Sequence, residues 1–291
     1  MIKTKQPFIS VIIPTLNEEK YLPRLLKDLS EQTTDNFEVI HVDGHSDDKT
    51  KKVANVYKHK LPHFTQLNCE VRHVSVQRNM GAAIAQAPYF LFLDADTQLP
   101  PYFIEGLSYQ LHRRTSDVFT TWAIPDSTET ADLAIITIIN LGINLSEVFK
   151  SPIAVGVCLG CTRKVFKAVG GFRSDVAFGE DEDFAKAAIK LGYCFHMYQQ
   201  PRFVYSFRRF RKEGTLPTMR QIAVKKVKEY THGIFSPKPP DYLMGGHHDY
   251  DEDRPVNPYN PLEISLKNTS LAKAKKTITE LLTLEKIESD L

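Results

Sequence analysis

Cysteine, excess charge and long apolar segments are all scarce in this sequence. Four cysteines in 291 residues are too few for a disulfide scaffold and are typical of a reducing compartment. Lys and Arg together number 37 and Asp and Glu 35, so the chain lacks the excess of positive charge expected of a protein that binds nucleic acid. The apolar run that follows the first seven residues is too short for the core of a signal peptide.

No segment has the length and apolarity of a membrane span. The most apolar stretch, residues 133–145, includes two Asn and falls short of the roughly 20 residues that cross a bilayer. Apolar residues (42%) and charged residues (25%) occur in the proportions of an ordinary globular protein, which excludes wholesale disorder and collagen-like repeats. We therefore expect a soluble, cytoplasmic protein with one large α/β domain or two small ones.

Strands and helices alternate through the first hundred residues. Continuous apolar runs predict four strands, at 8–13, 37–42, 70–74 and 89–93. Apolar residues at helical spacing predict helices between them, at 21–29, 47–57 and 77–86. This alternation predicts an α/β fold with a right-handed, doubly wound and mostly parallel sheet.

The alternation becomes less regular after Pro100 and Pro101. We expect further strands at 117–124, 154–161 and 193–205, and helices at 130–149, 164–169 and 181–191. Residues 236–261 are rich in proline, which is typical of a linker or a surface strap, and residues 262–291 return to helical spacing. The chain therefore divides into a main domain at 1–235, with halves at about 8–115 and 116–235, a linker at 236–261 and a helical tail at 262–291.

Polar residues follow the predicted strands of the first half. An open parallel sheet binds ligands at the carboxyl ends of its strands. The polar clusters near those ends are residues 14–19, 43–48, 78–79 and 94–96. Taken singly, residues such as Asn17 or Ser46 could equally well cap the helices that follow, since Ser, Asp and Asn are common N-caps. Because all four clusters reach the same edge, we favour a shared binding site.

Asp94 and Asp96 come directly after an apolar strand. Two carboxylates at the rim of a buried sheet are costly to desolvate unless a cation accompanies them. Carboxylates together with substrate phosphates are common ligands of Mg²⁺ and Mn²⁺. A solvated turn is the alternative, but the buried strand before the pair favours a metal site.

A second acidic cluster, residues 180–183, stands at the start of a predicted helix. Acidic residues there interact favourably with the helix dipole, which is the simpler explanation. Four consecutive carboxylates exceed what a helix start needs, and their mutual repulsion raises the pKa of some members. One of them near a metal-bound substrate could therefore act as a general base.

Six short motifs follow one another in an order that resembles a known family. They are SVIIPTLNEE (10–19), DGxSxDxT (43–50), RNxG (78–81), DAD (94–96), GGF (170–172) and GEDED (179–183). In this order and spacing they resemble family 2 glycosyltransferases, from about residue 8 to residue 210. The resemblance implies a nucleotide-diphosphosugar transferase fold of the GT-A type, and a transfer that inverts the anomeric carbon of the sugar.

The resemblance also implies how a nucleotide would be held, with the nucleotide-binding half at about 8–115 and the acceptor half at about 116–235. Pro14, Thr15 and Glu18 would line the nucleoside pocket. Asp43 would hydrogen-bond the base, and Arg78 would flank it.

The same resemblance implies the groups that carry the chemistry. Asp94 would reach the ribose or the metal, and Asp96 would hold Mn²⁺ or Mg²⁺ on the diphosphate. Asp181, in the Glu-Asp pair after Gly179, matches the catalytic base of the family.

A basic cluster, residues 207–212, follows the last predicted strand. Arginine donates bidentate hydrogen bonds that suit a phosphate, so we expect Arg208 and Arg209 to bind the diphosphate. A solvated helix start is the alternative. Part of the family carries a similar Ser/Thr-x-Arg-Arg stretch, whereas many other members have a metal-binding His where Ser206 stands here. The resemblance therefore implies no protein ligand for the metal at residue 206.

Two further features favour structural interpretations. Cys158 and Cys161 have the spacing of a redox or zinc site, but no second pair follows, so buried core residues are the better interpretation. His196 lies in an apolar strand and is expected to be a core or cleft residue.

The sequence thus predicts a metal-dependent inverting glycosyltransferase. We expect its partners to be a UDP- or GDP-sugar donor and a glycan or lipid-linked acceptor, with residues 133–145 able to touch the inner face of a membrane. A sugar-phosphate nucleotidylyltransferase is one alternative, but it requires a Gly-rich loop after the first strand, where this chain has PTLNE at 14–18. A catalytically dead relative that binds nucleotide-sugars or partner proteins is the other, and the intact Asp94, Asp96 and Asp181 speak against it.

Overall fold

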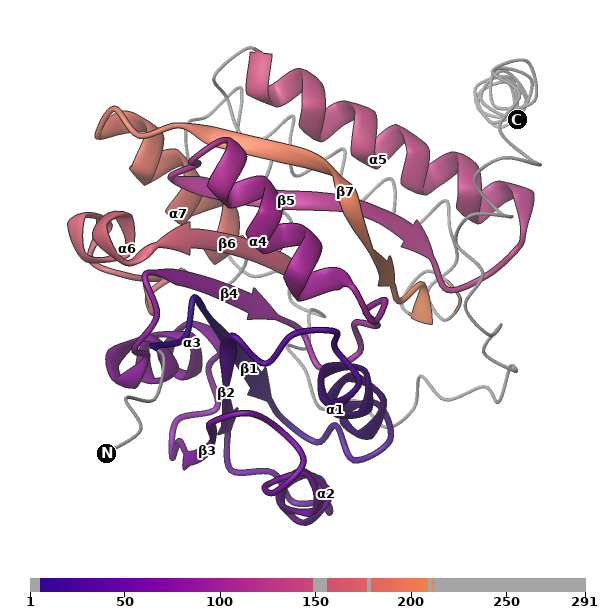
Figure 1. Cartoon of the computed structure of the whole chain (residues 1–291), viewed down its shortest axis with the longest axis vertical. Coiled ribbons are helices and arrows are strands. Elements are labelled where there is room, and N and C mark those ends of the chain that lie inside the picture. Colours follow the sequence, from indigo (N-terminus) through magenta and orange to yellow (C-terminus); the bar gives the residue numbers. More distant parts are fainter. Residues whose placement is uncertain (1–5, 149–155, 177–178, 209–210, 212–291) are drawn as a thin grey trace, which may run out of the picture.

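The computed structural model describes residues 6–148, 156–176, 179–208 and 211, which form one seven-stranded sheet with helices packed against it (Figure 1). The strand order is β3-β2-β1-β4-β6-β5-β7. The strands are β1 (Ile9–Thr15), β2 (Phe37–Asp43), β3 (Phe64–Asn68), β4 (Tyr89–Leu93), β5 (Val118–Pro125), β6 (Cys158–Thr162) and β7 (Phe195–Tyr205). The helices are α1 (Leu22–Ser30), α2 (Thr50–Val56), α3 (Val74–Ile84), α4 (Phe103–Arg113), α5 (Thr130–Val148), α6 (Arg163–Val169) and α7 (Glu180–Lys190). The predicted α/β class and mostly parallel sheet are confirmed.

Strands β1, β2 and β4 form the centre of the N-terminal half. Every residue of β1 and β2 is buried, as their continuous apolar runs predict. β1 pairs in parallel with both β2 and β4, so the carboxyl ends of all three strands lie at one edge of the sheet. The adjoining edge positions are then close in space although they are far apart in the sequence.

The prediction of a strand at 70–74 is wrong. β3 lies earlier, at Phe64–Asn68, and pairs in parallel with β2 at the edge of the sheet. Every residue of β3 is at least partly exposed, so this strand lacks the apolar run that marks a buried one. Within the predicted strand, His73 instead accepts a hydrogen bond from the backbone N–H of Ser75 and caps α3.

The C-terminal half departs from the parallel pattern. β6 runs antiparallel to both β4 and β5, whereas β5 and β7 are parallel. Gly160 of β6 lies so close to Phe119 of β5 that a Cβ atom would come within 2.1 Å of the ring. Cys158 and Cys161 are buried free thiols in β6, which confirms them as core residues.

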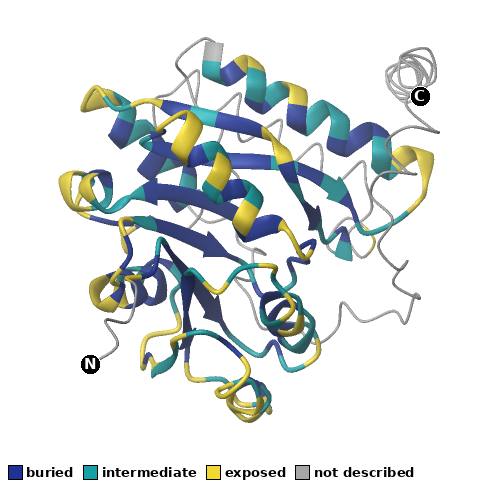
Figure 2. Ribbon diagram, in the orientation of Figure 1, coloured by how far each residue is buried: buried dark blue, intermediate teal, exposed yellow. Residues whose placement is uncertain are grey.

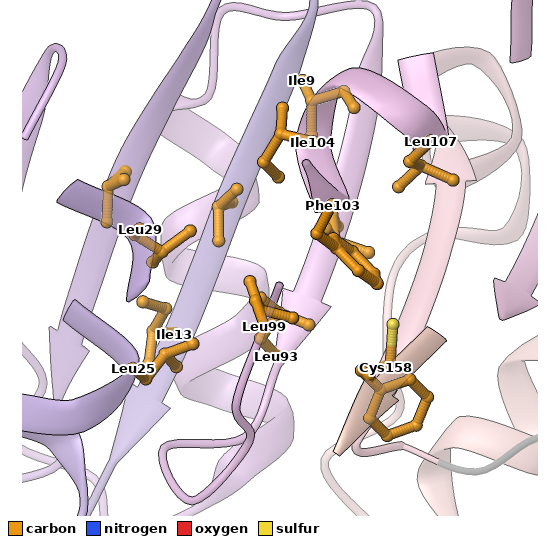
Figure 3. Close-up of a cluster of buried hydrophobic side chains, with 14 of the residues drawn as sticks. Ile9, Ile13, Leu25, Leu29, Leu93, Leu99, Phe103, Ile104, Leu107 and Cys158 are labelled. Carbon is orange, nitrogen blue, oxygen red and sulfur yellow. The ribbon is translucent and has the colours of Figure 1, made fainter. Parts of the chain in front are cut away.

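Two apolar clusters pack against the sheet, because successive strand residues point to opposite faces. One cluster joins the strands to α1 and α4, and Figure 3 shows part of it, with Leu25 and Phe103 directed at the strands. The other contains side chains of α3, α6 and α7. Figure 2 shows the resulting buried layer along the central strands. Among the helices that the structure describes, none combines the length and apolarity needed to cross a bilayer.

The predicted linker at 236–261 and tail at 262–291 lie outside the described residues, as does the end of the predicted main domain beyond residue 211.

Candidate functional site

The candidate site lies at the carboxyl ends of β1, β2 and β4. Thr15 and Asp43 end β1 and β2 and are partners in the parallel register, so they are neighbours across the two strands. Asp94 follows β4 directly. The structure therefore brings three of the predicted strand-end residues to one edge.

The first group of contacts surrounds Thr15 and Asp43. The Thr15 hydroxyl lies 2.8 Å from Nε2 of His41, a fully buried ring on β2. The Asp43 carboxylate is also fully buried; its Oδ2 accepts the backbone N–H of Ser46 and lies 3.4 Å from Nζ of Lys51. Its Oδ1 has no hydrogen-bond partner among the described residues. This oxygen keeps a free lone pair, so it could accept an N–H from a ligand once the residues that cover it move aside.

His41 escaped the sequence analysis because it lies inside an apolar run that reads as strand. Burial lowers the pKa of His41 to about 4, so the ring is neutral at physiological pH. The signal that could have revealed it is a polar ring two residues before Asp43, on the same face of β2.

The second group is built around Arg78 of α3, whose side chain is 3% exposed. One end of its guanidinium donates to Glu180 at 2.7 Å, and the other donates to Asp94 at 3.1 Å and to the backbone carbonyl of Gly156 at 3.2 Å. The guanidinium also lies over the ring of Phe172, 5.3 Å from its centroid. Arg78 thus joins the end of β4 to the start of α7, a connection that sequence analysis did not predict.

Burial raises the pKa values of two acids next to this arginine, Asp94 and Asp181. It raises the pKa of Asp94 to about 6, against the opposing charge of Arg78. Burial, reinforced by repulsion from Glu180, raises the pKa of Asp181 to about 7. Asp181 Oδ1 accepts the backbone N–H of Glu182 at 2.8 Å. A carboxylate with a pKa near neutrality can take up a proton under physiological conditions.

Gly156 makes room for the Asp181 side chain. A Cβ atom at residue 156 would lie 3.0 Å from Asp181 Oδ2 and 3.0 Å from a terminal nitrogen of Arg78. The other candidate base, Asp183, lies 3.8 Å from a terminal nitrogen of Arg173.

The third group places Arg208 between two acids. Its terminal nitrogens donate to both carboxylate oxygens of Glu18, at 2.9 and 3.1 Å. Its Nε lies 3.0 Å from Asp96 Oδ2, and the guanidinium stacks 4.5 Å from the centre of the Tyr21 ring. The two carboxylates raise the pKa of Arg208 above its ordinary value although burial lowers it. Sequence analysis placed these three residues in one site but did not foresee that they pair with one another.

The donor chemistry at the end of β4 fits a hard divalent cation. Asp94 and Asp96 offer carboxylate oxygens, which Mg²⁺ and Mn²⁺ prefer. Within the part of the chain that the structure describes, no cluster of three His, Cys, Asp or Glu side chains could hold a metal. A cation here would therefore depend on the two aspartates together with oxygens of a ligand. The predicted phosphate contact Arg209 lies outside the described residues.

His196 is a partly buried residue of β7, and its contacts in the described part of the chain are with α5, with Arg114 and within β7 rather than with these groups. Its Nδ1 lies 2.6 Å from Glu147 of α5, and its ring meets Tyr198 edge to face. The predicted core or cleft setting of His196 is confirmed.

Solved structures that share this fold are glycosyltransferases. The chain is similar to the mannosyltransferase PcManGT from Pyrobaculum calidifontis in complex with GDP-Man and Mn²⁺, with a TM-score of 0.58 and 20% identity over 76% of this chain and 65% of that one. It is also similar to Staphylococcus aureus TarS 1-349 in complex with UDP-GlcNAc, with a TM-score of 0.55 and 20% identity over 68% and 58% of the two chains. The fold is therefore of the GT-A type.

Curated relatives match shorter stretches at higher identity. Validoxylamine A glucosyltransferase from Streptomyces hygroscopicus subsp. limoneus is 36% identical over 105 residues, which are 35% of this chain and 23% of that protein. Poly(ribitol-phosphate) beta-N-acetylglucosaminyltransferase TarP from Staphylococcus aureus is 34% identical over 113 residues, 38% of this chain and 35% of that protein. This chain thus spans only a minor part of the length of these relatives.

The model of one family covers most of the strands and helices that form the site. The family described as Glycosyl transferase family 2 matches residues 10–170, more than half of the chain. The match includes the ends of β1, β2 and β4, with Thr15, Asp43 and Asp94. The chain belongs to glycosyl transferase family 2.

Proposed function

We propose that this protein is a metal-dependent, inverting glycosyltransferase that moves a sugar from a UDP- or GDP-sugar to an acceptor hydroxyl. The observation that carries the proposal is the meeting of Asp94 and Glu180 on the buried guanidinium of Arg78. This contact brings an acid with metal-binding chemistry to the helix start that carries Asp181, a candidate base. A nucleotide-sugar bound at the edge of the sheet would then have a cation site and a proton acceptor close to its reacting carbon.

The nucleoside would lie over the ends of β1 and β2. The unpartnered Oδ1 of Asp43 can accept an N–H from the edge of a base, which both uracil and guanine present. Relatives of this fold solved with UDP-GlcNAc and with GDP-Man support both donors equally. Pro14 and Glu18 flank this region, on either side of Thr15 along the chain.

The diphosphate would lie over the end of β4. Asp94 and Asp96 would hold Mn²⁺ or Mg²⁺, which neutralises the negative charge that develops on a departing nucleoside diphosphate. Arg208 would exchange one or both of its acidic partners for phosphate oxygens, since its planar fork suits either type of acceptor. We include Arg209 as a second phosphate contact on the strength of its sequence motif.

Asp181 would accept the proton of the acceptor hydroxyl as that oxygen attacks the anomeric carbon on the face opposite the diphosphate. Attack from that face inverts the configuration and requires one base. Burial raises the pKa of Asp181 to about 7, so its carboxylate can accept a proton near neutral pH. Arg78 would hold the neighbouring Glu180 in place.

The acceptor would be a glycan or a lipid-linked molecule at the inner face of a membrane, with the protein in the cytoplasm. The support is on α5, where Leu141 and Leu145 are 50% and 57% exposed and lie one helical turn apart. Two half-exposed leucines in that arrangement suit shallow contact with lipid.

One experiment separates this function from its two alternatives. The purified protein is incubated with radiolabelled UDP- and GDP-sugars and Mn²⁺, and the products are resolved. Release of nucleoside diphosphate, with free or transferred sugar, supports the proposal. A parallel incubation contains a labelled sugar 1-phosphate and UTP or GTP, and formation of a nucleotide-sugar with release of pyrophosphate there would indicate a nucleotidylyltransferase. Binding of a nucleotide-sugar without turnover in either incubation would indicate a catalytically dead relative.

A further inference from the structure

His41 is a polar ring where the core of the sheet would ordinarily be apolar. It lies in β2 with β1 on one side and β3 on the other, opposite Ile13 and Gln66 in the register, and is 0% exposed. Its Nε2 is 2.8 Å from the Thr15 hydroxyl, and its Nδ1 has no partner among the described residues. Burying such a ring costs free energy that an aliphatic residue would not.

The unpartnered Nδ1 indicates which nitrogen carries the proton. The neutral ring has one N–H and one lone pair. A proton on Nδ1 would leave a buried donor without an acceptor, whereas a proton on Nε2 uses the donor and leaves only a lone pair unsatisfied. Orphaned buried N–H groups are the rarer of the two defects. We therefore assign the proton to Nε2, which donates to Thr15 Oγ1.

This assignment leaves the proton of the Thr15 hydroxyl free to be donated elsewhere. Thr15 is the register partner of Asp43, whose Oδ1 is a buried acceptor without a partner in the described part of the chain. A donor and an acceptor thus lie next to each other at the ends of β1 and β2. Nucleobases present the matching pair, an N–H beside a carbonyl oxygen or a ring nitrogen.

We infer that His41 is a positioning residue for nucleobase recognition, because it holds the Thr15 hydroxyl as a hydrogen-bond donor beside the Asp43 acceptor. The inference rests on the proposed function, since it assumes that a nucleotide binds at this edge. It adds a residue that never touches the ligand and acts through Thr15. His41 contributes to the binding of the base and not to that of the ribose or the phosphates.

Calorimetric titration of the full chain with UDP, GDP and ribose 5-diphosphate, each with Mn²⁺, tests whether His41 affects the binding of the base alone. Ribose 5-diphosphate carries the same sugar and phosphates without a base. We expect His41→Val to weaken whichever nucleotide the wild type prefers by about five- to tenfold, the effect of one hydrogen bond. The affinity of the His41→Val variant for ribose 5-diphosphate should equal that of the wild type.

Two variants sharpen the test. His41→Gln keeps an N–H donor at a similar reach and should restore nucleotide affinity to within about twofold of the wild type. Thr15→Val should lose the same affinity as His41→Val, and the double variant should lose no more than either single one. Additive losses, equal losses for ribose 5-diphosphate, or unchanged nucleotide binding by His41→Val would each overturn the inference.

A measurement on the wild type keeps the inference testable if His41→Val does not fold. The ¹⁵N chemical shifts of the His41 ring distinguish the two neutral tautomers, and we expect the proton on Nε2. A proton on Nδ1 would overturn the inference. If the wild type binds neither UDP nor GDP, the proposed function fails as well, and that result differs from one in which nucleotide binds but His41 has no influence.

Discussion

In the N-terminal half, about residues 8–115, the site residues other than Arg78 of α3 stand at or just after the ends of parallel strands. In the described part of the C-terminal half they stand at the start of α7 and after β7. Strand register fixes the first set, with Thr15 opposite Asp43. Charge contacts between the halves hold the second set, through Arg78 with Glu180 and Arg208 with Glu18. The comparison shows a site whose proposed nucleotide side is built into the sheet, and whose proposed catalytic side contacts it through two arginines in addition to the pairing of β4 with β6.

The largest effect is expected on turnover, from a substitution of the proposed base Asp181. Asp181→Asn keeps the size and polarity of the side chain and removes its basicity, so turnover should fall by about 10²- to 10⁴-fold while UDP or GDP affinity is unchanged. Steady-state kinetics and calorimetry measure the two quantities. Asp183→Asn is the matched control and should keep turnover within a few-fold of the wild type. If the outcomes for the two variants are reversed, Asp183 is the base.

Breaking the connection between the halves should lower stability. Arg78→Met leaves Glu180 and Asp94 without their buried partner, and removing one member of a buried ion pair costs about 3–5 kcal/mol of unfolding free energy. We expect the lower end of that range, because the Asp94 side chain is 36% exposed. Urea unfolding measures the change. Arg173→Met removes an exposed arginine that pairs with Asp175 and lies 3.8 Å from Asp183, and its effect on the free energy of unfolding should stay within about 0.5 kcal/mol. Equal losses of unfolding free energy in the two variants would show that the contacts of Arg78 with Glu180 and Asp94 do not stabilise the fold.

Removing a carboxylate at the end of β4 should affect the nucleotide side only. Asp96→Ala should weaken Mn²⁺-dependent binding of UDP or GDP by at least about tenfold, because one of two cation ligands is lost. Its thermal unfolding should stay close to that of the wild type. Asp175→Ala, an exposed carboxylate of the C-terminal half, serves as the control. Wild-type affinity of Asp96→Ala, with Mn²⁺ still required, would remove Asp96 from the cation site.

The smallest effect is a dependence on pH. Since the pKa of Asp181 is raised to about 7, kcat/KM should rise about tenfold between pH 6 and pH 8 as the carboxylate ionises. Stability should change in the opposite direction. The folded protein holds this proton more tightly than the unfolded chain does, so the contribution of Asp181 to stability falls as pH rises from about 4 through 7. Asp181→Asn should flatten the kcat/KM profile and remove the Asp181 share of the stability trend, while the raised pKa values of Asp94 and Asp28 leave a smaller trend of the same sign. A wild-type profile that is flat in kcat/KM would argue against this base.

The central strands and the α/β class could be predicted because buried parallel strands are long apolar runs. β3 could not, because an edge strand needs no such run and Phe64–Asn68 is partly exposed throughout. The clustering of Thr15, Asp43 and Asp94 followed from the rule that strand ends meet at one edge. Their order along that edge depends on the pairing of β1 with both β2 and β4, which only the structure provides.

Contacts between the halves were beyond the reach of sequence analysis. Arg78 and Glu180 are 102 residues apart, and Arg208 and Glu18 are 190 residues apart, so no local pattern links them. His41 was hidden for a different reason: its neighbours in β2 are apolar, and a strand pattern does not distinguish a ring packed in the core from one that orients a hydroxyl.

Arg208 has a consequence for the end of the reaction cycle. Its guanidinium already pairs with both Glu18 and Asp96, with Tyr21 stacked beside it. A nucleoside diphosphate that engages Arg208 therefore replaces existing charge pairs and gains only the difference between the two sets. After the proposed sugar transfer, the same acids would be available to pair with the arginine again as the diphosphate departs. If Arg208 binds the diphosphate as proposed, this exchange would limit how tightly the nucleoside diphosphate is retained and would favour its release before the next round.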